Sequence, residues 1–274
     1  MKSRFLPLLC LCTALALGGC APSPSQPAAP STPSSSQEPG NTDAQLPPSE
    51  AQLSGRVLAV SEKSLLLAGE AANEVYALSP PAEMVSLHTG NGEGVTMGDW
   101  ITVAYDGSVL ETWPARLGTV TGILVDDAAF DDLSLLYLQV LCDLWDRDAG
   151  LNEGAEILGV DLSQTRLTPA EQQAVAYLFG LAQGREVVTG TLDELAKAGY
   201  ITEEPLPDTG AVARYWETGC LFSITETEAE AGQAAFSAQK WRSGTGAYFF
   251  TNCTASQNDR GHWAGYEIGA EAIS

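Results

Sequence analysis

The chain has 274 residues, and its 35 acidic side chains outnumber the 13 basic ones, so that the net charge is −22 at neutral pH. Nucleic-acid binding requires a basic surface that displaces counterions, and adsorption to anionic lipid requires one too. We therefore expect neither activity, and the acidic surface favours solubility and basic partners.

The first 19 residues have the pattern of a secretory signal peptide. Two basic residues precede an apolar run over residues 5–17, and small residues follow it. The run is too short to span a bilayer about 30 Å thick as a helix. Leu17-Gly18-Gly19-Cys20 resembles the lipobox of bacterial lipoproteins, which implies cleavage before Cys20 and attachment of lipid to its sulfur. The alternative is an ordinary secretory signal with a chance cysteine.

Residues 20–50 are predicted to be a lipidated cysteine followed by a disordered tether. Eight prolines fall between residues 21 and 50, and large apolar side chains are rare there. Such a segment buries too little apolar surface to offset its ordering entropy, and a proline-rich chain stays semi-extended. We expect a protein held by its lipid on the extracytoplasmic side of the cell membrane.

The sequence of residues 51–126 predicts a series of short strands. Apolar or alternating runs occupy residues 53–61, 64–69, 74–79, 99–113 and 116–125. Asp106-Gly107, in the middle of the fourth run, is a strong hairpin signal. The pattern predicts a small, closed or partly closed antiparallel β-barrel of the OB-like kind, with residues 79–97 as a long loop.

Segment 98–116 begins with Gly-Asp, has Asp-Gly in its middle and ends with Glu-Thr-Trp-Pro-Ala-Arg. It resembles a small β-barrel domain of unassigned function in secreted lipoproteins of Gram-positive bacteria, and the likeness covers roughly residues 52–125. The resemblance implies a barrel and an extracytoplasmic location but no catalytic residue. Trp100, Tyr105 and Trp113 could stack on a sugar, although aromatic residues of such barrels more often belong to the core.

Residues 127–274 predict an α+β domain with helices on one face of an antiparallel sheet. Apolar residues spaced by three and four predict a helix over 131–147. Capping boxes at Thr168–Glu171 and Thr191–Glu194 predict two more helices, which stop near Gly184 and Gly199. Strands are expected at 156–163, 186–188, 220–227, 234–241, 246–256 and 262–274.

Residues 238–274 resemble the end of an uncharacterised extracellular domain that often follows such a barrel. The order of three helices and then long strands also resembles the cone-shaped domains similar to nuclear transport factor 2, which enclose a pocket. Neither likeness implies an activity, because one fold serves many functions.

Three cysteines remain outside the signal peptide and lipid site. Cys220 and Cys253 lie in strand-like segments and are the candidate disulfide, whereas Cys142 lies in a helical one. Three buried free thiols are the alternative. No C-x-x-C pair is present, and the acidic segment from Asp146 to Glu153 fails the EF-hand spacing, so we expect no metal or cofactor.

The strongest candidate for ligand binding is Trp241-Arg242, a cationic and aromatic pair followed by two glycines in an acidic chain. It could hold a carboxylate ligand. The alternative places Trp241 in the core and pairs Arg242 with a nearby acidic side chain.

No catalytic residue is assigned from the sequence. His88 and His262 fall in different predicted domains, and no nucleophile motif accompanies them. Adjacent carboxylates such as Asp131-Asp132 are typical of a solvated acidic surface. We expect a membrane-anchored binding or interaction module for a small molecule, a peptide or an envelope protein. The alternative is an envelope hydrolase that uses carboxylates of the C-terminal domain.

Overall fold

The structure is a computed structural model, and it describes residues 46–70, 74–81, 94–207 and 210–274. The signal motif Leu17–Gly19, Cys20, most of the tether and His88 lie outside the described residues. The described residues from 46 to 274 belong to one compact unit. Among the described helices, none combines the length and the apolar character needed to cross a bilayer.

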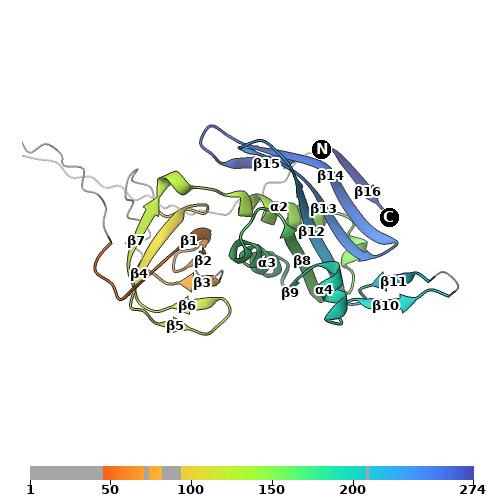
Figure 1. The fold of residues 1–274 in the computed structure, drawn as a ribbon, viewed down its shortest axis with the longest axis horizontal. Helices are drawn as coiled ribbons and strands as arrows, with labels where there is room; N and C mark the ends of the chain where they lie inside the picture. The colour runs from red at the N-terminus through yellow and green to blue at the C-terminus, as the bar shows by residue number, and fades with distance from the viewer. Residues whose placement is uncertain (1–45, 71–73, 82–93, 208–209) are drawn as a thin grey trace, which may run out of the picture. The chain divides into compact units, whose positions relative to one another are not determined.

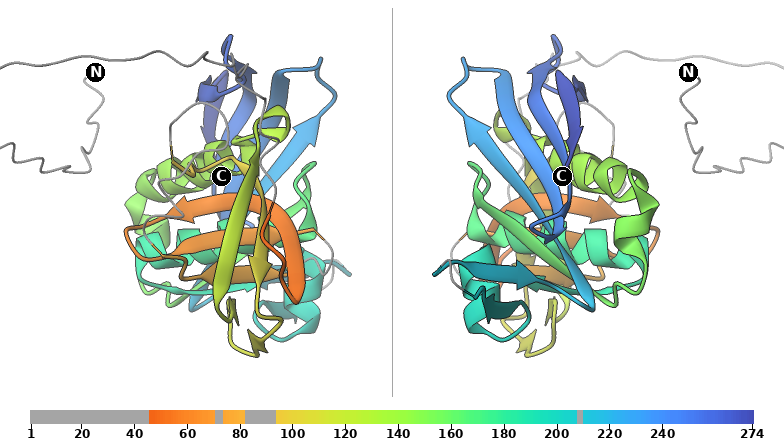
Figure 2. Two further views of the ribbon diagram at one scale, coloured as in Figure 1. Left: turned by 90° about the vertical axis from the view of Figure 1, so that its left-hand side faces the viewer. Right: turned by 90° about the vertical axis from the view of Figure 1, so that its right-hand side faces the viewer.

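A seven-stranded sheet comes first in the chain (Figure 1). Its strands are β1 (Ala51–Val60), β2 (Leu65–Gly69), β3 (Val75–Leu78), β4 (Trp100–Tyr105), β5 (Val109–Leu110), β6 (Ala115–Leu117) and β7 (Val120–Asp126). Their order is β5-β6-β3-β2-β1-β4-β7, and the sheet is strongly curled (Figure 2). Within the described residues the two end strands do not pair, so the sheet is open. The closed barrel that the strand pattern allowed is therefore not formed.

Two further expectations for this region are corrected. The sheet is not purely antiparallel, because β3 and β6 pair in parallel. The Asp106-Gly107 turn does not close a hairpin, because β4 pairs with β7 and β5 pairs with β6. The carboxylate of Asp106 instead accepts the backbone N–H of Thr119, 2.8 Å away, which ties the turn to the start of β7. The Asp-Gly turn formed, but β4 pairs with β7, which lies further along the chain, and not with β5, which follows the turn.

The two faces of this sheet are both apolar, as the alternation along β2 shows. Leu65 and Leu67 lie in a core internal to the sheet, with Val57, Ile101 and Val103. The intervening side chains of β2 belong to a second cluster, which includes residues of the helices that follow. A strand that is buried on both faces has a continuous apolar sequence, and Leu-Leu-Leu-Ala in β2 is such a sequence.

The second sheet has nine strands, and three α-helices pack against it. Its strands are β8 (Ile157–Gln164), β9 (Glu186–Thr189), β10 (Thr202–Pro205), β11 (Val212–Tyr215), β12 (Gly219–Thr227), β13 (Gln233–Ser243), β14 (Gly246–Gln257), β15 (Trp263–Glu267) and β16 (Ala270–Ile273), and its helices are α2 (Leu133–Asp146), α3 (Pro169–Gln183) and α4 (Leu192–Lys197). The predicted capping boxes are both formed. The mixed α+β class is therefore confirmed.

The arrangement of this sheet differs from the expectation in two ways. It is mixed, because β8 runs parallel to both β9 and β12. Helix α3 connects β8 to β9, and a helical crossover returns the chain to the same end of the sheet, which makes the two strands parallel. The helices also lie on both faces. α2 and α3 cover the face that carries Phe222, whereas α4 covers the face that carries Leu221.

A largely buried ion pair connects the first sheet to α3. Arg56 of β1 donates from Nε to Oε1 of Glu171 at 2.9 Å, and Oε2 of the same carboxylate accepts the backbone N–H of Thr168 in the capping box. Arg56 also donates to the carbonyl oxygens of Gly98 and Ala129. The guanidinium and carboxylate thus have partners beyond each other, as buried charges require.

Candidate functional site

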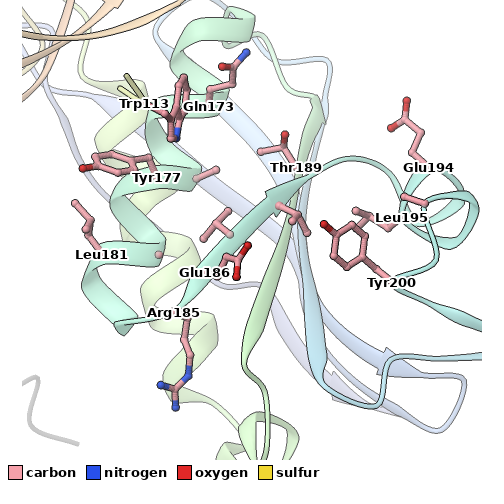
Figure 3. Close-up of a pocket in the computed structure, with 15 residues that line it drawn as sticks. Trp113, Gln173, Tyr177, Leu181, Arg185, Glu186, Thr189, Glu194, Leu195 and Tyr200 are labelled. Atoms are coloured by element: carbon pink, nitrogen blue, oxygen red, sulfur yellow. The ribbon is translucent and has the colours of Figure 1, made fainter. Parts of the chain in front are cut away.

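A groove of about 760 Å³ runs along β9, between α3 and α4 (Figure 3). Its lining combines aromatic and aliphatic side chains with a few charges: Trp113, Gln173, Ala176, Tyr177, Gly180, Leu181, Arg185, Glu186, Val187, Val188, Thr189, Glu194, Leu195, Ala198 and Tyr200. A mostly apolar hollow of this size with a few polar groups is the usual form of a ligand site.

The local sequence explains why β9 lies between two helices. α3 ends at Gly184, which adopts φ 62°, and the N–H of Arg185 then donates to the carbonyl of Gly180 as the chain turns into β9. A Cβ at Gly180 would lie 2.4 Å from Cγ2 of Val187, so glycine is required where the helix meets the strand. Immediately after β9, Thr191 caps α4.

Several apolar side chains of the groove face solvent. Leu181 is 60% exposed and Trp113 is 58% exposed, and Tyr200 lines the opposite side. The rings of Trp113 and Tyr177 meet edge to face with centroids 6.5 Å apart. Figure 3 places Tyr177 and Leu181 along α3 and Tyr200 across β9 from them. Exposed apolar residues gathered in one hollow are typical of an interaction surface.

The charges of the groove lie at different ends of β9. Arg185 and Glu186 are at its start, and Glu194 lies beyond its end, next to a smaller hollow of about 260 Å³ that Asp161 also lines. The backbone N–H of Thr191, and then its hydroxyl, donate to the Glu194 carboxylate and lower its pKa. Glu194 is therefore ionised at neutral pH, and acidic groups dominate the C-terminal end of β9.

The structure matches the alternative for Trp241, whereas among the described residues Arg242 contacts backbone carbonyls and not the acidic side chain that the alternative named. Trp241 is buried in the core under α4. The guanidinium of Arg242 donates to four backbone carbonyls, those of Leu151, Glu153, Trp216 and Glu217. Ligand binding by this pair stays a prediction, and the carbonyl contacts favour a role in holding the loop after α2 to the sheet.

The candidate disulfide is not formed, and Cys142, Cys220 and Cys253 are free thiols. Cys253 lies level with Phe236 of β13 and, through it, with Glu226 of β12. Cys220 and Cys253 are thus two strands apart and separated by about 20 Å along the sheet, whereas a disulfide needs Cα atoms within about 7 Å. Burial raises the pKa of each thiol to about 11, which makes them unreactive at neutral pH.

The acidic segment after α2 holds an ammonium group of the protein itself. Nζ of Lys240 donates to the carbonyl oxygens of Trp145, Arg147 and Asp148 and to Oδ1 of Asn152. Its side chain is fully buried. Among the described residues no cluster of metal-ligating side chains is found.

His262 has a partner that the sequence did not indicate. Its Nδ1 lies 3.1 Å from Oδ2 of Asp132, and the ring of Phe130 packs on it. Asp132 Oδ1 also accepts the backbone N–H of Trp263. In the described part of the chain no hydroxyl or thiol hydrogen-bonds His262, so the pair fastens β15 to the start of α2 and lacks the nucleophile of a hydrolytic triad.

No sequence motif indicated the groove as a whole, although Trp113, one of the residues that could stack on a sugar, lines it. Tyr177 and Leu181 are one helical turn apart on α3 and lie off its buried stripe, which was a usable signal. Thr189 and Tyr200 gave no signal, because only the folded chain brings them together. A comparison with protein-family models found no match, and a comparison with curated proteins found none either.

Proposed function

We propose that this protein is a membrane-anchored extracytoplasmic lipoprotein that works as a binding module, with the groove along β9 as its binding site. The observation that carries the proposal is the groove itself, where exposed Leu181, Trp113 and Tyr200 surround a strand edge. Solvated apolar side chains in a hollow are stabilised when a partner covers them.

The anchor rests on Leu17-Gly18-Gly19-Cys20 and the proline-rich tether. Lipid attachment at Cys20 would hold the chain because each buried CH₂ contributes about 0.8 kcal/mol, and two or more acyl chains bind firmly. We expect Cys20→Ala to abolish lipid labelling and to release the protein from the membrane fraction. Retention of the unlabelled variant in that fraction would contradict the anchor.

We also infer that the first sheet is an OB-like barrel opened between β5 and β7. The parallel pairing of β3 with the later strand β6 supports this inference, because it joins the far edge of the β1–β3 meander to the end of the domain. In this proposal the barrel supports the groove from the side of α3, where Trp113 of the β5–β6 connection reaches Tyr177.

The binding proposal is tested by a thermal-shift screen of residues 21–274 against peptides, metabolites and glycans. The groove variant is Leu181→Asp, and the matched control is Ile273→Asp, because Ile273 is also exposed (68%) but lies on β16. A ligand should raise the melting temperature of the wild type and the control but not of the groove variant. Equal shifts in all three proteins, or none with any compound, would contradict the site.

The envelope hydrolase remains an alternative prediction. A hydrolytic carboxylic acid usually has a raised pKa, but in the part of the chain that the structure describes the pKa values of the Asp106 and Glu194 carboxyl groups are lowered by hydrogen bonds that they accept, and no carboxyl group there has a raised one. The structure therefore supplies no observation that favours this alternative over binding.

A further inference from the structure

We propose that the groove binds an extended, basic peptide segment, which adds to the second sheet as a new strand along the outer edge of β9. The inference rests on the proposed function and names the class of partner. It is carried by the free edge of β9, by the side chains on both flanks of that edge, and by the charges along it.

The first step concerns the backbone of β9. Within the described residues this strand has one neighbour, β8, so its other edge is unpaired. The N–H of Gly190 donates to the carbonyl of Val160 in β8. Because successive residues of a strand direct their backbone groups to opposite sides, Val187 and Thr189 direct theirs away from β8. An unpaired row of this kind is a template for another strand.

The flanks of the edge are suited to an added strand. Helix α3 lies on one face of the sheet at β9 and α4 on the other, so a helix flanks the strand on each side of the groove (Figure 3). An added strand would lie about 4.8 Å from β9, and its side chains would alternate between the two faces. One set would contact Tyr177 and Leu181, and the other would contact Leu195 and Tyr200. Backbone hydrogen bonds with alternating side-chain pockets define β-strand addition.

The charges around β9 indicate that the peptide is basic. Around β9, Glu186, Glu194 and Asp161 outnumber Arg185, and the whole chain carries a net charge of −22. Such a field attracts a basic segment and repels an acidic one. The acidic end of β9 is its C-terminal end and Arg185 is at the other, so a peptide antiparallel to β9 would place its amino-terminal half near the carboxylates.

A second copy of this chain fits the edge less well. An isologous, antiparallel pairing of two β9 strands would bring Glu186 and Glu194 of both copies into one small area with only Arg185 of each copy to offset them, and an excess of like charge across paired strands is destabilising. Self-association is therefore an outcome that the experiment must detect, and we do not propose it.

The experiment uses two pooled libraries of amidated heptapeptides with residues 21–274 as the receptor. In the first library the two amino-terminal residues are lysine and the other five are drawn from Val, Leu, Tyr and Thr, and in the second glutamate replaces lysine. We expect binding from the lysine library and none from the glutamate library, by fluorescence anisotropy. Absence of binding from the lysine library at millimolar peptide would overturn the proposal.

Backbone pairing is tested on the wild-type protein with the best lysine peptide. N-methylation of one alternate set of its amides removes the donors that face β9 and should weaken binding at least tenfold. N-methylation of the other set, which faces solvent, should change binding less than threefold. Equal effects of the two sets would overturn strand addition.

The matching protein variants are Thr189→Pro and Thr189→Val. Proline is tolerated on an edge strand where its N–H faced solvent, so Thr189→Pro removes one outward donor, whereas Thr189→Val keeps it. We expect about tenfold weaker binding to the proline variant and little change with valine. A circular-dichroism melt checks that both variants fold, and the N-methylated peptides decide the question if the proline variant does not.

The outcomes separate this inference from the proposed function. If Leu181→Asp abolishes binding of a screened ligand and Thr189→Pro does not, the groove is the site but strand addition is wrong. If neither change matters, both proposals fail. A concentration-dependent dimer that light scattering detects, and that Thr189→Pro abolishes, would assign the edge to a second copy and overturn the peptide.

Discussion

Lys240 and Arg242 are two cations of one strand that bind backbone carbonyls of the loop after α2. Lys240 lies on the face toward α2 and donates to the last carbonyls of that helix, where a positive charge is favourable. Burial lowers the pKa of its ammonium group, and nearby Asp146 and Asp148 oppose this effect. Positive side chains in this acidic protein are therefore not automatically ligand sites.

Arg242→Ala should lower the free energy of unfolding by about 2–3 kcal/mol, because it leaves four carbonyls without their charged donor. The matched control is Arg260→Ala in the exposed turn before β15, which should change stability little. Urea denaturation measures both. If Arg242→Ala instead left stability unchanged and weakened an anionic ligand, the original ligand-binding prediction for Trp241-Arg242 would stand.

Asp106 provides a pH-dependent prediction. The hydroxyl of Ser108 and the backbone N–H groups of Thr119 and Ser108 donate to its carboxylate and hold its pKa well below the usual value of 3.8. A carboxyl group with a lowered folded-state pKa contributes stability above its unfolded pKa, and this contribution is lost as the pH falls toward the folded-state pKa. The stability difference between wild type and Asp106→Asn should be constant above pH 5 and should shrink below pH 3.8. Thermal melts across this range measure it, and a difference that grows on acidification would contradict the assignment.

At the scale of elements, α3 and α4 begin with the same capping box but differ in what the glutamate touches. Glu171 of α3 is buried and pairs with Arg56 of the first sheet. Glu194 of α4 is exposed, and its partners among the described residues are the backbone N–H and the hydroxyl of Thr191 in its own cap. The same local motif is thus part of a core contact in one helix and of a groove rim in the other.

Glu171→Ala should therefore destabilise the protein by about 2–3 kcal/mol, since it removes the carboxylate partner of the partly buried Arg56 guanidinium, which keeps only the carbonyl oxygens of Gly98 and Ala129. Glu194→Ala removes an equivalent cap without a buried charge and should cost clearly less. Chemical denaturation of both variants gives the comparison. Similar losses for the two changes would show that the Arg56 pair adds nothing to the cap.

At the scale of the whole molecule, the two predicted domains, residues 51–126 and 127–274, share a cluster of apolar side chains. Leu58, Leu66, Ala68 and Val75 of the first sheet lie in the same core cluster as residues of α2 and α3. The first sheet also has an internal core of its own. The domain boundary near 126–130 stays a prediction. If the two domains were separated there, the side chains of the shared cluster would be exposed to solvent.

We expect the fragments 51–126 and 127–274 each to give dispersed amide spectra, and we expect them to associate when mixed, because both expose part of the shared cluster. Amide resonances of β2 and α3 should shift on mixing, whereas those of β14 should not. If neither fragment gave a dispersed spectrum, residues 51–274 would be a single domain with one core.

Local signals determined much of the architecture. The two capping boxes, the three-and-four spacing of α2 and most apolar runs depend on neighbouring residues, and these elements formed near their expected positions, whereas β10 and β11 were not predicted and the segment 262–274 forms two strands. For the three cysteines the sequence indicated only which pair was the better candidate for a disulfide, because disulfide formation depends on which strands lie side by side.

Strand partners and the groove were decided by tertiary structure. The choice between β5 and β7 as the partner of β4, the parallel course of β8 and the second helical face all depend on contacts between residues far apart in the chain. The groove depends on them most, because its floor is a strand edge that stays open only when no other segment pairs with it. A sequence records the propensity of β9 to be a strand, but only the folded chain shows that one of its edges is left without a neighbour.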